Sequence, residues 1–133
     1  MTTAVAGAPR TWLRLEGLAV LAASVIAYRW QLGGWTTFAL LFLAPDLGLL
    51  GYFGGPRLGA RTYNLTHNYV GPLFLMLYGL YVGRADVVPY ALIWTAHIGF
   101  DRALGLGLKY PQAFEATHLG RVAGPGRRTP RAG

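Results

Sequence analysis

The sequence contains no cysteine and only one serine, Ser24. Without cysteine there is neither a disulfide scaffold nor a thiol that could bind a metal or carry out redox chemistry. Ser24 is not part of a nucleophile elbow, which excludes a serine hydrolase of that type. Charged residues make up only 13 % of the chain, against roughly 25 % in soluble domains. So little charge argues against a disordered chain.

The composition is instead dominated by apolar residues. They account for 53 % of the 133 residues, and glycine alone accounts for 19, about twice its usual share. A chain of this length holds one domain. Together these features predict an all-α fold, and more specifically an integral membrane bundle.

Four stretches are apolar enough to cross a bilayer, which takes about 20 residues for roughly 30 Å of hydrocarbon. They cover residues 12–28, 35–53, 58–81 and 87–108. Glycines and a proline separate them, which is typical of the short turns between antiparallel helices. The sequence therefore predicts four transmembrane helices within residues 12–120. Residues 1–11 precede them, and residues 121–133 form a basic tail with no apolar period, expected to be disordered.

The basic residues predict the orientation of these helices. With four spans, both termini and the second loop share one side of the membrane. Nine basic residues fall on that side: Arg10, Arg14, Arg57, Arg61, Lys109, Arg121, Arg127, Arg128 and Arg131. Only Arg29 and Arg84 fall on the other. By the positive-inside rule, both termini face the cytoplasm, and the protein belongs in the inner (plasma) membrane.

The expected partners follow from this location. The net charge of +7 is accounted for by a basic tail beside anionic lipid, so the bilayer itself is the main partner. No nucleic-acid recognition module accompanies the arginines, and we expect no nucleic-acid binding. Four short helices around a polar pocket could need a second copy to close it, which leaves a homo-oligomer open.

Polar residues inside the predicted spans are the main functional clue, because ionisable groups are costly in hydrocarbon. Asp46 and His97 fall near the middle of the second and fourth spans, and His67 lies about 14 Å into the third. His97 and Asp101 are four residues apart and share a helix face. These groups come from three spans yet converge on the cytoplasmic half, which predicts a polar pocket there.

One interpretation of the pocket is a metal site. Imidazoles and carboxylates bind zinc and similar divalent ions, and the candidate ligands are His67, His97, Asp101 and Asp46. Such an ion could serve hydrolysis of a membrane-soluble or lipid-like substrate. Asp46 would act as ligand or general base.

Two further polar residues complete that interpretation. Asn64, three residues before His67, would orient a ligand. Arg102, next to Asp101, could hold an anionic group. A metal-dependent enzyme is nevertheless only one of several interpretations of the pocket.

Two alternatives remain open for the same residues. The histidines and aspartates could relay protons or pass a small solute through a water-lined cavity. They could also be structural, with the charged groups paired and the remaining side chains hydrogen-bonded between helices. Neither alternative involves an enzyme.

Several short strings resemble one known family. They are Pro45-Asp46-Leu47, Leu50-Gly51-Tyr52, Gly59-Ala60, Tyr63-Asn64 with His67, His97-Ile98-Gly99 with Asp101-Arg102, Gly107-Leu108-Lys109-Tyr110, and Phe114 with Thr117-His118-Leu119-Gly120. From about Leu15 to Gly120, the sequence resembles the bacterial domain of unknown function 4260 family of small multi-pass membrane proteins. Gly48 and Leu106 depart from the pattern, where a serine and an aromatic residue are usual.

The resemblance implies a helical membrane protein with no assigned reaction. It also implies that Lys109 and His118 belong to the same pattern as the polar residues of the spans. By position alone, His118 follows the last span and is expected to face solvent. On the family pattern it joins Asp46, Asn64 and Arg102 as a candidate catalytic residue.

Overall fold

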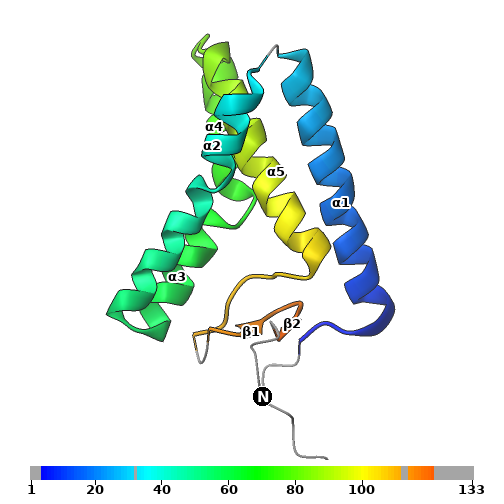
Figure 1. Cartoon of the computed structure of the whole chain (residues 1–133), viewed down its shortest axis with the longest axis vertical. Helices are drawn as coiled ribbons and strands as arrows, with labels where there is room; N and C mark the ends of the chain where they lie inside the picture. Colours follow the sequence, from blue (N-terminus) through cyan, green and yellow to red (C-terminus); the bar gives the residue numbers. More distant parts are fainter. Residues whose placement is uncertain (1–3, 32, 112–113, 122–133) are drawn as a thin grey trace, which may run out of the picture.

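The computed structural model describes residues 4–31, 33–111 and 114–121, and most of them are helical (Figure 1). In chain order the elements are α1 (Gly7–Trp30), α2 (Trp35–Phe42), the 3-10 helix η1 (Ala44–Gly54), α3 (Pro56–Thr66), α4 (Val70–Tyr81), the short 3-10 helix η2 (Ala85–Val87), α5 (Val88–Leu104), β1 (Ala116–Thr117) and β2 (Gly120–Arg121). The expected helical class is confirmed. Of the expected basic tail, all but Arg121 lies outside the described residues.

Two helical stretches, Gly7–Trp30 and Trp35–Gly54, are long and apolar enough to cross a membrane by length and composition. The first of them, α1, is longer at both ends than the predicted span over residues 12–28. The chain runs the length of the molecule along α1, returns along α2 and η1, and ascends again through α3 and α4 before α5 descends (Figure 1). The α1–α2 and α4–α5 turns lie at one end, and the η1–α3 turn lies at the other.

The second helical stretch changes type at its proline. α2 ends at Phe42 and η1 begins at Ala44, with Pro45 in its first turn. Pro45 has no N–H to continue the α-helical ladder, which accounts for the change of helix type. Beyond it, η1 packs closely on α3, where the Thr62 hydroxyl donates to the Gly48 carbonyl at 2.6 Å. A Cβ atom on Gly48 would lie only 2.8 Å from the Thr62 carbonyl oxygen of α3.

The third predicted span, residues 58–81, is not one continuous helix. The structure breaks it into α3 and α4 at residues 67–69. The cause is Pro72, which cannot donate to the carbonyl of Asn68 and would clash with it in a continuous helix. The Asn68 side chain covers both broken ends: its Nδ2 donates to the Asn64 carbonyl at 2.7 Å, and its Oδ1 accepts from Val70 N–H at 2.8 Å.

The fourth predicted span is too long at its C-terminal end. α5 stops at Leu104, because Gly105 adopts φ +84° in the left-handed region, where glycine is favoured. Leu106 N–H then donates back to the Asp101 carbonyl at 2.8 Å, as in a Schellman motif. The chain after Gly105 crosses the lower end of the molecule and forms the antiparallel β1–β2 hairpin, which the sequence did not predict (Figure 1).

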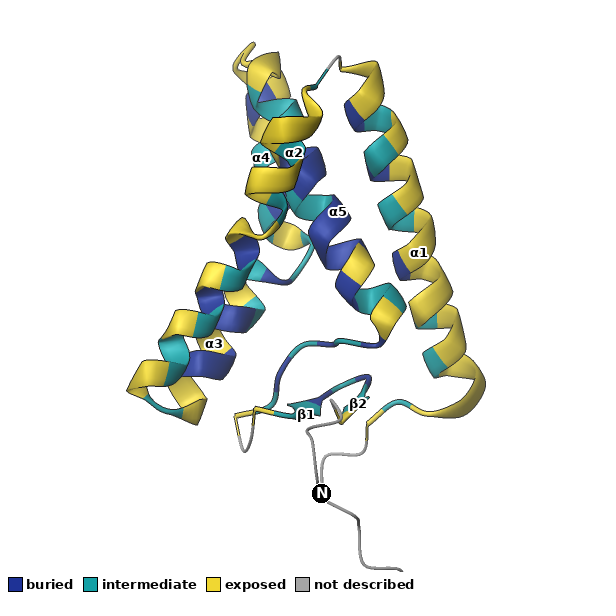
Figure 2. Cartoon of the chain, in the orientation of Figure 1, coloured by how far each residue is buried: buried dark blue, intermediate teal, exposed yellow. Residues whose placement is uncertain are grey.

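α5 is the central helix of the fold. Eight of its 17 residues are buried, whereas α1, α2 and α4 expose large parts of their surface (Figure 2). α1 crosses α5 where Gly17 and Gly99 meet: a Cβ on Gly99 would lie 2.8 Å from the Gly17 carbonyl oxygen and from the Leu21 nitrogen. Small residues at such crossings let two helix backbones approach closely.

Large apolar side chains cover the outside of the helices. Phe53 is 92 % exposed, Leu40 73 % and Phe74 70 %. Monomeric soluble proteins rarely expose apolar patches of this extent. The surface therefore matches a surrounding of low polarity.

We expect Gly99→Ala to destabilise the protein by about 1–3 kcal/mol, because the added methyl group meets backbone atoms of α1 that cannot move aside. The matched variant Gly34→Ala adds the same group beside a single atom, Thr37 Oγ1, 4.0 Å away, and should change stability by less than about 0.5 kcal/mol. Thermal unfolding of both variants in one detergent tests this. Equal melting temperatures would refute the close α1–α5 crossing.

Candidate metal site

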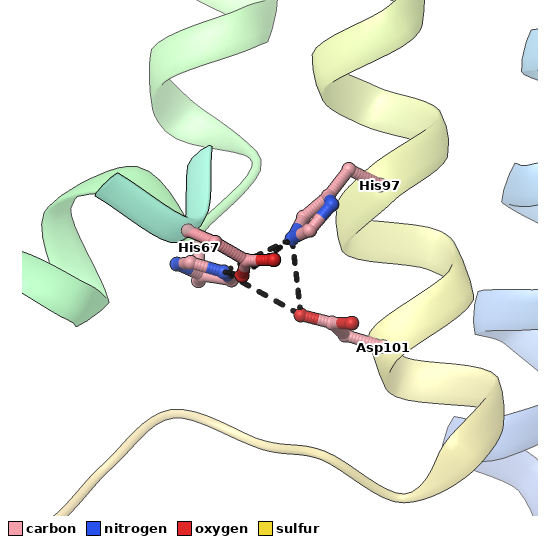
Figure 3. Close-up of side chains that lie close together, drawn as sticks. His67, His97 and Asp101 are labelled. Carbon is pink, nitrogen blue, oxygen red and sulfur yellow. Dashed lines mark hydrogen bonds and ion pairs between the residues drawn. The ribbon is translucent and has the colours of Figure 1, made fainter. Parts of the chain in front are cut away.

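Four ionisable side chains meet where two interrupted helical stretches approach α5. Asp46 follows Pro45 in the first turn of η1, and His67 caps the broken end of α3. His97 and Asp101 lie one turn apart on the buried face of α5. Figure 3 shows the two imidazoles and the Asp101 carboxylate pointing toward one another across the space between α3 and α5.

The four side chains present single atoms to a common point. The two Nε2 atoms of His67 and His97 are 3.1 Å apart. Asp46 Oδ1 lies 3.2 Å from the first and 3.3 Å from the second. Asp101 Oδ2 lies 3.5 and 3.3 Å from the same two nitrogens. All four atoms lie within 4.8 Å of one another.

The backbone of α3 orients the His67 ring. Its Nδ1 lies 2.9 Å from the Tyr63 carbonyl oxygen and 2.8 Å from the Thr66 hydroxyl. A carbonyl oxygen can only accept, so Nδ1 carries the hydrogen. The neutral ring then has its lone pair on Nε2, facing the common point. Histidines that bind metals are commonly held in this way by a second hydrogen bond to a backbone carbonyl.

Burial distinguishes one member of the cluster from the other three. The side chains of His67 and His97 are 1 % and 2 % exposed, and that of Asp101 is 11 % exposed. The Asp46 side chain is 38 % exposed. The cluster is therefore closed on three sides and open beside Asp46.

The donor set and its spacing fit a divalent ion. Zinc binds imidazole nitrogen and carboxylate oxygen at about 2.0–2.2 Å, so two ligands of a tetrahedral site lie about 3.3–3.6 Å apart. Five of the six distances in the cluster are 3.1–3.5 Å. The four predicted metal ligands are thus brought together, and five of their six spacings are close to those of a tetrahedral site.

Tyr63 is a member of the site that the sequence analysis missed. Its ring stacks on the His67 ring with centroids 3.7 Å apart, and its buried hydroxyl lies 3.5 Å from Asp101 Oδ2. The signal was available, since Tyr63 precedes His67 by four residues and so shares its helix face. The phenol can donate a hydrogen bond to the carboxylate and so fix its orientation.

Asn64 lies away from the cluster and binds the segment after α5 instead. Its Oδ1 accepts from the backbone N–H of Lys109 at 2.6 Å, and its Nδ2 donates to the Lys109 carbonyl at 2.8 Å. This two-point contact ties that segment to α3. Asn64 therefore positions Lys109 and does not contact a metal ligand directly.

Lys109 is buried beside Tyr63. Its Nζ donates to the Phe114 carbonyl at 2.7 Å and lies 3.7 Å from the Phe114 ring centroid and 4.9 Å from that of Tyr63. Burial lowers the pKa of the Lys109 ammonium, because a low-dielectric surrounding disfavours charge. Lys109 thus forms the second layer of the site, behind the Tyr63 ring.

Arg102 and His118 hold the backbone together at the same end of the molecule. The Arg102 guanidinium donates to the carbonyls of His67 at 3.0 Å and Leu106 at 3.3 Å. His118, expected to face solvent, instead accepts the Leu108 N–H on its Nδ1 at 2.8 Å. Burial, and then the nearby Arg102, lower the pKa of His118. Both side chains therefore bind backbone atoms around the cluster.

The fold and the site together define a small helical protein with a buried cluster of two histidines and two aspartates. The family model for the domain of unknown function DUF4260 matches residues 10–122. The chain belongs to this family, as the resemblance of its motifs indicated. Neither a curated protein nor a solved structure matches the chain.

Proposed function

We propose that Asp46, His67, His97 and Asp101 bind one divalent metal ion, such as zinc. The observation that carries the proposal is the convergence of four ligand atoms from three elements, with spacings of 3.1–3.5 Å between nitrogen and its neighbours. Two imidazoles and two carboxylates are costly to bury together without an ion or shared protons. The hydrogen bond between His67 Nδ1 and the Tyr63 carbonyl supports the tautomer that a metal needs.

The further step is that the site hydrolyses a membrane-soluble substrate. A divalent ion supplies Lewis acidity and lowers the pKa of a water molecule that it binds. Catalytic sites commonly keep three protein ligands and leave one position open. His67, His97 and Asp101 are the three closed-in ligands, and Asp46 stands on the open side. In hydrolysis Asp46 would give up its position on the ion to the water molecule and accept a proton from it as general base.

A second candidate function rests on the contact between the histidines. Their Nε2 atoms are within hydrogen-bonding distance of each other, and each lies near both carboxylates. Such an array of acids and bases can pass protons, or can hold three helices together without any reaction. In either case the cluster would hold protons where the first proposal has a metal.

We further propose that the chain crosses the inner membrane four times, with both termini in the cytoplasm. The spans are α1, α2 with η1, α3 with α4, and α5. The exposed apolar side chains on these helices support this. So does the separation of the basic residues: Arg57 lies at the start of α3 and Arg84 in the α4–α5 connection, at opposite ends of the molecule (Figure 1).

The absence of native cysteine makes this topology directly testable. We expect a membrane-impermeant maleimide to label Arg84→Cys in intact spheroplasts and to label Arg57→Cys only after permeabilisation. Both positions are exposed, so the side of the membrane decides the result. Labelling of both variants in intact spheroplasts would contradict four spans with cytoplasmic termini.

The metal site is tested by the metal content of protein purified without chelators. We expect close to one equivalent of zinc, manganese or iron in the wild type by mass spectrometry. The double variant His67→Ala/His97→Ala should lose it, because two imidazole ligands are gone. Helical circular dichroism and gel-filtration volume should stay as in the wild type.

His118→Ala is the matched control, because it removes an imidazole outside the cluster and should keep the metal. Metal-free wild type, even after added zinc, manganese or iron, would contradict the metal site and favour the hydrogen-bonded cluster. Metal that persists in the double variant would contradict the assigned ligands.

A further inference from the structure

A cavity of about 300 Å³ lies beside the cluster. Residues from α2, η1, α3, α4 and α5 line it: Leu41, Ala44, Pro45, Thr66, Leu75, Tyr90, Ile93 and Trp94. It is therefore lined by the same elements that carry the four candidate ligands, with α4 in addition. Its volume is at the lower end of the range for small-molecule sites.

The cavity wall and the cluster are close neighbours along the chain in three places. Pro45 and Thr66 line the cavity, and they immediately precede Asp46 and His67 in the chain. Ile93 also lines the cavity and lies four residues before His97, on the same face of α5. One helical turn, about 6 Å, therefore separates the cavity wall from the cluster along α5.

Most of the cavity wall is hydrocarbon, and its polar groups are largely satisfied. Trp94 Nε1 donates to the Thr66 carbonyl at 2.6 Å. The Thr66 hydroxyl contacts the Tyr63 carbonyl and His67 Nδ1 within α3. Among the residues that the structure describes, no charged side chain lines the cavity. A polar ligand would lose its hydration there without finding partners, whereas an alkyl chain would lose nothing.

The cavity is also continuous with the apolar outer surface of the helices. Two of its lining residues, Leu41 and Ala44, are exposed. The residues that precede them in the chain, Leu40 and Leu43, are exposed too. A ligand can therefore reach the cavity across an apolar surface rather than through a polar one. This favours an occupant that is dissolved in the bilayer.

We propose that this cavity binds the hydrocarbon chain of a single-chain amphiphile whose oxygen-bearing head group binds at the cluster. The inference rests on the proposed metal site and names its substrate class. The chain lies along Pro45, Ile93 and Trp94, and the head group extends past Thr66 and His67. The cavity then selects substrates by the length and shape of one chain.

Hydroxamates, which chelate metals through two oxygens, provide the probe. The protein is placed in nanodiscs and loaded with cobalt(II), whose visible spectrum reports binding of a new ligand. Acetohydroxamate is compared with decanohydroxamate in the wild type, in Ala44→Phe and in Leu75→Phe, which add bulk to the cavity from η1 and from α4. Leu77→Phe is the control, because it adds bulk at an exposed position on α4 outside the cavity.

Acetohydroxamate should bind all four proteins equally, because it does not reach the cavity. Decanohydroxamate should bind Ala44→Phe and Leu75→Phe at least about tenfold more weakly than the wild type and Leu77→Phe. Partitioning of the long probe into the nanodisc is the same for all four proteins and cancels. If one cavity variant fails to fold, the other carries the comparison.

Two negative results are distinguishable. If cobalt binds and acetohydroxamate shifts its spectrum, but decanohydroxamate binds all four proteins alike, the chain-binding cavity is refuted while the metal site stands. If the wild type binds no cobalt, the metal site itself fails and the substrate class fails with it.

Discussion

Four side chains that converge on one point place the strongest constraint on this fold. Two imidazole nitrogens lie 3.1 Å apart, with one oxygen of Asp46 and one of Asp101 beside them. Buried groups of this kind are stable only when each one finds a partner. Because the partners come from η1, α3 and α5, these three elements must meet at a fixed distance and angle. The close contact at Gly48 allows η1 and α3 to come that close.

The interruptions of the helices serve the same constraint. A continuous helix through residues 58–81 would carry the His67 backbone past the cluster within a regular ladder of hydrogen bonds. The break at residues 67–69 instead frees the His67 carbonyl, which Arg102 binds at 3.0 Å. Broken helices in an apolar surrounding are tolerated where other groups of the protein satisfy the freed backbone. Here the side chains of Asn68 and Arg102 do so, and the break places His67 in the cluster.

The sequence alone predicts the helical class, the positions of the turns and the four members of the cluster. These follow from apolar run lengths, from glycine and proline, and from the rarity of ionisable groups in apolar segments. The break before α4 was missed because the run of residues 70–81 is apolar enough to hide the effect of Pro72. The roles of Asn64, Lys109 and His118 were missed for a different reason. They depend on contacts over tens of residues, such as that between Asn64 and Lys109, which no local pattern encodes.

The central claim is that these four side chains form one coordination sphere. X-ray absorption at the zinc edge, on protein loaded with one equivalent of zinc, tests it most directly. The account predicts four nitrogen or oxygen neighbours at about 2.0–2.1 Å, with the outer scattering of two imidazole rings. Neighbours at longer distance without imidazole scattering would show that zinc binds elsewhere, and would contradict the claim.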